Sequence, residues 1–181
     1  MQIARLRVEP ETRAQSLLIR FPSGWSRPVG GSYEASEELV LLDGLLTMSG
    51  EAYGPGDWAF FPAGFVRTST YAQPEVFAFA RFGGPARWRE GEGPAIERVR
   101  AHVRDDQRDG GSPLGEGRAR LLRAGAAESA WLVDELPARA PHTAELLAID
   151  HRAWAFVVQG EQMPGFEGLT FCRIVAPGGT T

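Results

Sequence analysis

Hydrophobic and polar residues alternate in short runs along this chain, a pattern typical of strands rather than helices. "ARLRVEP" at 4–10 alternates with a period of two, and "SLLIRF" at 16–21 is a short apolar run. Similar runs follow at 37–48, 57–64 and 75–84, separated by turns rich in Gly and Pro. Short strands at this spacing predict an all-β antiparallel sandwich or barrel.

Residues 84–118 break the pattern, because they are charged and rich in glycine. We interpret them as a connector, with one short helical or strand piece around Ile96, Val99 and Val103. The expected organisation is therefore a first unit over 1–83, this connector, and a second unit over 119–181.

The hydrophobic pattern then returns at an offset of 115 or 116 residues. Four short matches share this offset: "ARLRVEP" at 4 with "ARLLRAG" at 119, "FPSG" at 21 with "LPAR" at 136, "LVLLDG" ending at Gly44 with "AFVVQG" ending at Gly160, and "FFPAG" ending at Gly64 with "VAPGG" ending at Gly179. We interpret them as two tandem copies of one strand unit.

The second copy stops just after its turn, so we expect it to lack the strands that correspond to 67–82. A missing strand would leave an open sheet edge, which another element or a second subunit would cover, or the two copies would merge into one barrel. The sequence leaves both arrangements open, and we expect a homodimer.

The formal net charge of -4, with no basic cluster, argues against nucleic acid and membrane surfaces as partners. No apolar run approaches the roughly 18 residues that span a bilayer. The alternating, charged N-terminus does not read as a signal peptide. Cys172 is the single cysteine, which excludes a disulfide within the chain and favours a reduced, cytoplasmic protein.

Two groups of spaced residues resemble the two motifs of the cupin superfamily, whose fold is a small antiparallel jelly-roll barrel. The matching positions are Gly24, Glu37 and Gly44 for the first motif, and Gly56, Pro62 and Gly64 for the second. The resemblance covers residues 20–83 well and the second copy weakly. It implies an all-β jelly-roll barrel with a second, partial cupin-like repeat, but turn residues alone say nothing about chemistry.

The metal-binding histidines that the resemblance implies are missing. The His-x-His positions fall on Gly30 and Ser32, or on Gly31 and Tyr33, and Arg67 stands in place of the third histidine. Glu37 alone remains of the usual four ligands, so we expect no metal and no other cofactor. An alternative metal site would have to be built from His142 and His151, which do not align with the ligand positions of the cupin motifs. The third histidine, His102, lies in the connector.

An ion pair between Glu37 and Arg67 is the simplest replacement for the metal. If Glu37 faces inward, as the resemblance implies, then Leu39 and Leu41 do too, because side chains alternate along a strand. The pair either plugs the barrel or lines a pocket. In a pocket, Arg67 would bind a carboxylate, enolate or phenolate, and Glu37 would act as general acid or base, with Tyr33 beside them.

Further polar and aromatic residues are candidates for binding the substrate: Ser32, Trp58, Phe60, Tyr71, Trp25 and Arg81. Aromatic side chains lining a barrel suit a flat ligand, either aromatic or polycyclic.

Two functions follow from this reading. The first is a metal-independent cupin enzyme that isomerises, dehydrates or cyclises a small organic molecule. The alternative is a non-catalytic module that binds or senses a small molecule. A cavity of about 300 Å³ or more would favour a ligand site, and a filled barrel would favour a structural role.

Overall fold

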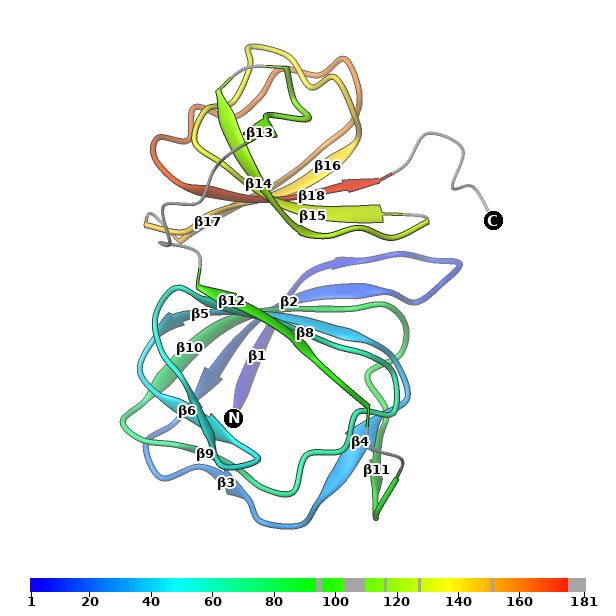
Figure 1. Ribbon diagram of the computed structural model, residues 1–181, viewed down its shortest axis with the longest axis vertical. Coiled ribbons are helices and arrows are strands. Elements are labelled where there is room, and N and C mark those ends of the chain that lie inside the picture. The colour runs from blue at the N-terminus through cyan, green and yellow to red at the C-terminus, as the bar shows by residue number, and fades with distance from the viewer. Residues whose placement is uncertain (94–95, 103–109, 116, 127, 151, 176–181) are drawn as a thin grey trace. The chain divides into compact units, whose positions relative to one another are not determined.

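The computed structural model describes residues 1–93, 96–102, 110–115, 117–126, 128–150 and 152–175 (Figure 1). These residues form eighteen strands and no helix, so none of their elements is a helix able to cross a membrane. The predicted all-β antiparallel class is confirmed. The chain divides into two compact units, Met1–Arg104 and Asp105–Thr181. The division falls within the segment that we expected as a connector.

The first unit is built on a six-stranded antiparallel sheet with the order β1-β2-β10-β5-β8-β12. The strands are β1 (Gln2–Val8), β2 (Gln15–Phe21), β5 (Glu37–Asp43), β8 (Asp57–Phe61), β10 (Val76–Phe82) and β12 (Val99–His102). β12 pairs with β8 and contains Val99, one of the three residues around which a short piece was expected, whereas Ile96 lies before the strand. Val103, the third residue of that prediction, lies outside the described residues.

Two smaller sheets complete this unit, and Figure 1 shows the four-stranded one facing the larger sheet. Its order is β3-β9-β6-β7, with β3 (Ser26–Arg27), β6 (Leu46–Met48), β7 (Glu51–Tyr53) and β9 (Thr70–Ala72). The third sheet pairs β4 (Gly31–Tyr33) with β11 (Trp88–Glu90). β11, like β12, comes from the segment expected as a connector.

Alternation along the strands builds the core of the first unit. On β10, Val76, Ala78, Ala80 and Phe82 all belong to one buried apolar cluster. β2, β5 and β8 contribute alternate residues to the same cluster, namely Leu17, Ile19, Phe21, Leu39, Leu41, Ala59 and Phe61. The inward direction predicted for Leu39 and Leu41 is therefore confirmed.

The second unit has one six-stranded antiparallel sheet in its described part, with the order β13-β14-β15-β18-β16-β17. The strands are β13 (Gly110–Gly111), β14 (Arg118–Arg123), β15 (Glu128–Val133), β16 (Ala144–Ala148), β17 (Ala153–Val157) and β18 (Thr170–Val175). Loop residues Leu114, Ala140 and Met163 pack with the sheet residues in a second apolar cluster.

The strand orders correct the predicted repeat. β18 lies between β15 and β16, as β10 lies between β2 and β5. The second unit therefore has a counterpart of β10, and the expectation is wrong for that strand, whereas no described strand of the second unit corresponds to β9. β17, which contains the start of "AFVVQG", takes the position of β8 rather than that of β5. Short apolar runs resemble one another, and only long-range pairing decides which strands correspond. The turn ending at Gly179 lies outside the described residues.

Candidate functional site

A cavity of about 220 Å³ lies inside the first unit. Its wall is largely apolar, with residues from β2, β5 and β6 such as Leu17, Leu39 and Met48. The charged or hydroxyl-bearing residues of the lining are Arg27, Tyr33, Glu37, Arg67 and Thr70. The barrel is thus not filled, although the cavity is smaller than the roughly 300 Å³ at which typical ligand pockets begin.

Glu37 is the first residue of β5, and the alternation of that strand turns its side chain inward with Leu39. The residue is 5% exposed. A buried carboxylate needs a partner, because removing an ion from water costs several kcal/mol.

Arg67 is fixed by the backbone around it. The turn before it is closed by a hydrogen bond from the Phe65 amide to the Pro62 carbonyl, with Gly64 at φ +79°. The Arg67 amide then donates to the Gly31 carbonyl at 2.7 Å, and the Gly31 amide donates back at 2.9 Å. Arg67 is 6% exposed, so its side chain is held inside the barrel.

The ion pair expected from the sequence is present, with Arg67 Nη2 donating to Glu37 Oε2. The guanidinium carbon also lies 4.7 Å from the ring centroid of Phe61 and 5.0 Å from that of Tyr33. Arg67 Nε is buried and has no hydrogen-bond partner among the described residues. Arg67 is therefore paired with Glu37 and still has one N–H donor, Nε, without an acceptor among the described residues.

Arg27 is a second cation in the lining, and it was not among the residues predicted from the sequence. Its guanidinium carbon lies 4.1 Å from the ring centroid of Trp88, and its Nη1 donates to the Tyr33 hydroxyl at 3.3 Å. No carboxylate of the described residues lies within ion-pair distance of Arg27. Trp88 was also missed, because it belongs to β11, in the segment interpreted as a connector.

Four of the nine predicted site residues line the cavity: Glu37, Arg67, Tyr33 and Trp25. The other five do not line it, and their positions follow from strand alternation. Ala59 and Phe61 of β8 enter the core, so Trp58 and Phe60 belong to the opposite face. On β10 the same rule turns Arg81 away, where it pairs with Glu9 at 3.0 Å.

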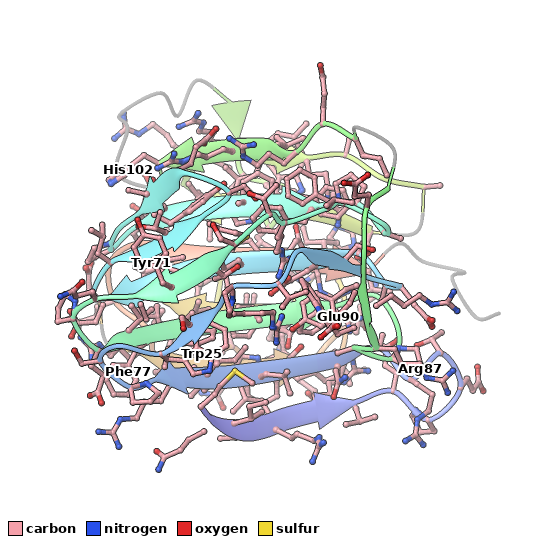
Figure 2. All side chains as sticks on the ribbon, turned by 90° about the horizontal axis from the view of Figure 1, so that it is seen from below. Trp25, Tyr71, Phe77, Arg87, Glu90 and His102 are labelled. Atoms are coloured by element: carbon pink, nitrogen blue, oxygen red, sulfur yellow. The ribbon has the colours of Figure 1, made fainter. Side chains whose placement is uncertain are left out.

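The remaining two residues lie on the short strands. Tyr71 of β9 is 46% exposed between buried neighbours, which places it on the outer face (Figure 2). Ser32 precedes Tyr33 on β4, and because Tyr33 faces the cavity, Ser32 faces away.

The residues around Glu37 do not fit a metal ion. Several imidazole, thiolate or carboxylate ligands must converge on such an ion. Here the Glu37 carboxylate is already bound by the guanidinium of Arg67. At Gly31, a Cβ would come within 2.8 Å of the Trp88 ring, so a histidine at this position would displace β11. No cluster of three or more possible ligands occurs in the described part of the chain. The alternative site with His142 and His151 cannot be placed, because His151 lies outside that part.

Comparison with solved structures identifies the fold. A proposed dioxygenase from Nostoc punctiforme PCC 73102 matches over 94% of this chain and 72% of its own, with a TM-score of 0.70 and 14% identity. A proposed glyoxylate-induced protein from Pseudomonas aeruginosa matches over 90% of this chain and 74% of its own, with a TM-score of 0.54 and 14% identity. A variant of the Bacillus subtilis oxalate decarboxylase matches over 89% of this chain and 68% of its own, with a TM-score of 0.52 and 12% identity.

At these identities the likeness concerns the fold alone: the chain has the cupin fold, as the resemblance implied. No family model matches the sequence, and neither does any curated protein.

Proposed function

We propose that the protein binds a small organic acid in the cavity of the first unit and performs acid–base chemistry on it without a metal ion. The reaction would be an isomerisation, a dehydration or a cyclisation. One observation carries this proposal: the buried Glu37–Arg67 pair lines an open and largely apolar cavity. Burying two ions is costly, and well-packed apolar residues often replace such a pair without loss of stability. A role toward a ligand gives the pair a reason to be there.

The size of the cavity restricts the ligand. Its volume is about 220 Å³. An apolar cavity of about 150 Å³ accommodates benzene. The cavity therefore suits a single substituted ring or a short branched chain better than the polycyclic ligand considered from the sequence.

The charge of the lining favours a carboxylate. Arg27 and Arg67 outnumber the single acid Glu37, which leaves the lining with one net positive charge. A ligand with one carboxylate would neutralise this charge. Arginine is suited to the task, because its planar fork matches the geometry of a carboxylate.

In this proposal, the two arginines hold the carboxylate of the ligand. Once that carboxylate engages Arg67, the Glu37 carboxylate is free to accept a proton from the ligand and return it at another atom. The Tyr33 hydroxyl, which accepts a hydrogen bond from Arg27, can donate its own proton to a ligand oxygen. The apolar wall excludes water, which strengthens each of these electrostatic interactions.

The alternative is a module that binds the same acid without transforming it. The ion pair itself favours this alternative, since a Glu37 carboxylate that stays bound to Arg67 cannot act as a base. Both functions require binding, and only the enzyme requires proton transfer.

The test is binding and proton exchange with phenylacetate and 3-methylbut-2-enoate. Calorimetry would measure binding, and proton NMR in D₂O would follow the loss of the CH₂ protons of phenylacetate and of the methyl protons of 3-methylbut-2-enoate, which are the protons that a base can remove from each acid. We expect Glu37→Gln to retain binding within a few fold and to abolish exchange. Glu34→Gln is the matched control, because Glu34 pairs with Arg89 and does not line the cavity.

Binding with no exchange by the wild-type protein would favour the binding module. If neither acid binds, or if Arg27→Gln and Arg67→Gln bind as tightly as the wild type, the proposed ligand class is wrong.

A further inference from the structure

Three arginines surround a second hollow of the first unit, outside the cavity described above. Arg5, Arg13 and Arg87 line it together with Val8, Gln15, Pro85 and Ala86, around a volume of about 500 Å³. All three arginine side chains are exposed. Figure 2 shows Arg87 near the turn of the β1–β2 hairpin.

The backbone brings the three arginines to the hollow from three separate places. Arg5 lies on β1, where the register with β2 shifts between Arg5 and Arg7. Such a bulge interrupts the alternation of a strand and redirects its side chains. Arg13 lies in the β1–β2 turn at φ 59°, a left-handed conformation that is uncommon for residues other than glycine.

Backbone hydrogen bonds hold the turn and the loop that carry two of these arginines. In the turn, the Arg13 amide donates to the Glu9 carbonyl at 3.0 Å, and the Glu9 amide donates to the Ala14 carbonyl at 2.8 Å. In the loop after β10, the Arg87 amide donates to the Pro85 carbonyl at 2.8 Å, and the Arg87 carbonyl accepts from the Glu34 amide at 3.0 Å. The two guanidinium groups therefore extend from ordered backbone.

The acidic residues near the hollow do not pair with its three arginines. Glu9 is bound by Arg7 at 2.6 Å and by Arg81 at 3.0 Å, and it also accepts from Thr12. Glu34 pairs with Arg89. Glu11, in the same turn, does not line the hollow.

None of the side chains of Arg5, Arg13 and Arg87 forms an ion pair or hydrogen bond with the described residues. Three like charges around one hollow repel one another, and a bound anion would remove that repulsion.

We propose that this hollow binds a small multivalent oxyanion, either a phosphate group or a polycarboxylate. Each guanidinium presents its N–H donors in a planar fork that matches both chemistries. Three such groups favour an anion of more than one charge, whereas the barrel cavity suits a single carboxylate. Ala86 lines both the hollow and the cavity, but the three arginines belong to the hollow alone, so this site does not depend on the proposed function.

The experiment is calorimetric titration of the protein with inorganic phosphate and, separately, with citrate at low ionic strength. We expect saturable binding of at least one of them, weakening as sodium chloride is added. Arg13→Gln and Arg87→Gln should each weaken it about tenfold, the effect of losing one charge-assisted hydrogen bond. Arg89→Gln removes the same charge two residues from Arg87, but outside the hollow, and should change the affinity less than twofold.

A preference for phosphate over citrate, or the reverse, would identify the group that the hollow recognises. The proposal is overturned if neither anion binds, or if Arg13→Gln and Arg87→Gln bind as tightly as the wild type. It is equally overturned if Arg89→Gln weakens binding as much as Arg13→Gln and Arg87→Gln do, since the loss would then come from the change in net charge rather than from a contact in the hollow. All three positions are exposed, so thermal unfolding should show that the variants remain folded.

Discussion

At the scale of single residues, the Glu37–Arg67 pair takes the place where the cupin resemblance implies a metal centre. A guanidinium and a metal ion both neutralise a buried carboxylate, but the guanidinium has a fixed plane and no vacant coordination position. Arg67 can therefore orient an anion, whereas the acid–base step belongs to Glu37 under the proposed function.

Removing one member of the pair should leave an uncompensated buried charge. We expect Arg67→Met to lower the free energy of unfolding by about 3–5 kcal/mol, the usual cost of breaking a buried ion pair from one side. Urea denaturation followed by tryptophan fluorescence would measure this loss. The double variant Glu37→Gln/Arg67→Met should recover much of it, since no buried charge then remains. An Arg67→Met protein as stable as the wild type would show that Arg67 does not compensate Glu37.

At the scale of elements, short turns and strand pairs place the residues of the site. The turn at Pro62–Phe65 leads into the backbone bridge between Gly31 and Arg67, and β11 brings Trp88 next to Tyr33 on β4. The position of Arg67 thus depends on a turn. The contact of Arg27 with Trp88 depends on the pairing of β11 with β4. Changes in these elements should alter the site without touching its polar groups.

The conformation of this turn can be tested by substitution at Gly64. At φ +79° an added Cβ is strained, so Gly64→Ala should lower the free energy of unfolding by about 1–2 kcal/mol. A Cβ there would meet only ordinary contact with Ile96, so the loss would report backbone strain rather than a clash. Gly54→Ala is the matched control, because its Cβ would also meet only an ordinary contact, with Leu45 at 4.0 Å, and its φ lies outside the left-handed range. Equal stability of the two variants in urea would contradict the assignment.

At the scale of the whole molecule, the two units share the order of five strands, β1-β2-β10-β5-β8 and β14-β15-β18-β16-β17, and differ in what surrounds these strands. The first unit adds two smaller sheets around its cavity, and loops complete the core of the second. The presence of β18 removes the argument that an open edge requires a second subunit. The homodimer stays a prediction, without that support.

The buried thiol of the second unit should make stability depend on alkaline pH. Burial raises the pKa of Cys172 from 9.0 to about 12, although the charge of Arg173 lowers it slightly. Because the folded thiol holds its proton more tightly, its contribution to stability is complete below pH 9 and is lost as the pH rises toward 12. We expect the urea midpoint to fall between pH 9 and 11, and to fall less in Cys172→Ala. A decline of the same size in both proteins would contradict this assignment.

The sequence by itself determined the all-β class. Together with the resemblance to the cupin motifs, it also determined the inward direction of Leu39 and Leu41 and the pairing of Glu37 with Arg67. These features depend on local rules, namely the two-residue period of a strand, the turn chemistry of Gly and Pro, and the need of a buried charge for a partner.

Only the tertiary structure decided which aromatic and cationic residues meet in the cavity. Trp88 reaches Tyr33 through the pairing of β11 with β4, two segments far apart in the sequence, and this pairing also brings Trp88 to Arg27. Trp58, Phe60 and Arg81 point away because of the sheet face that their registers select. The pairing of β18 with β15 and β16 is equally non-local. Hydrogen bonds between distant strands leave no mark in the local pattern, so the correspondence of the two units and the composition of the site could be seen only once the chain was folded.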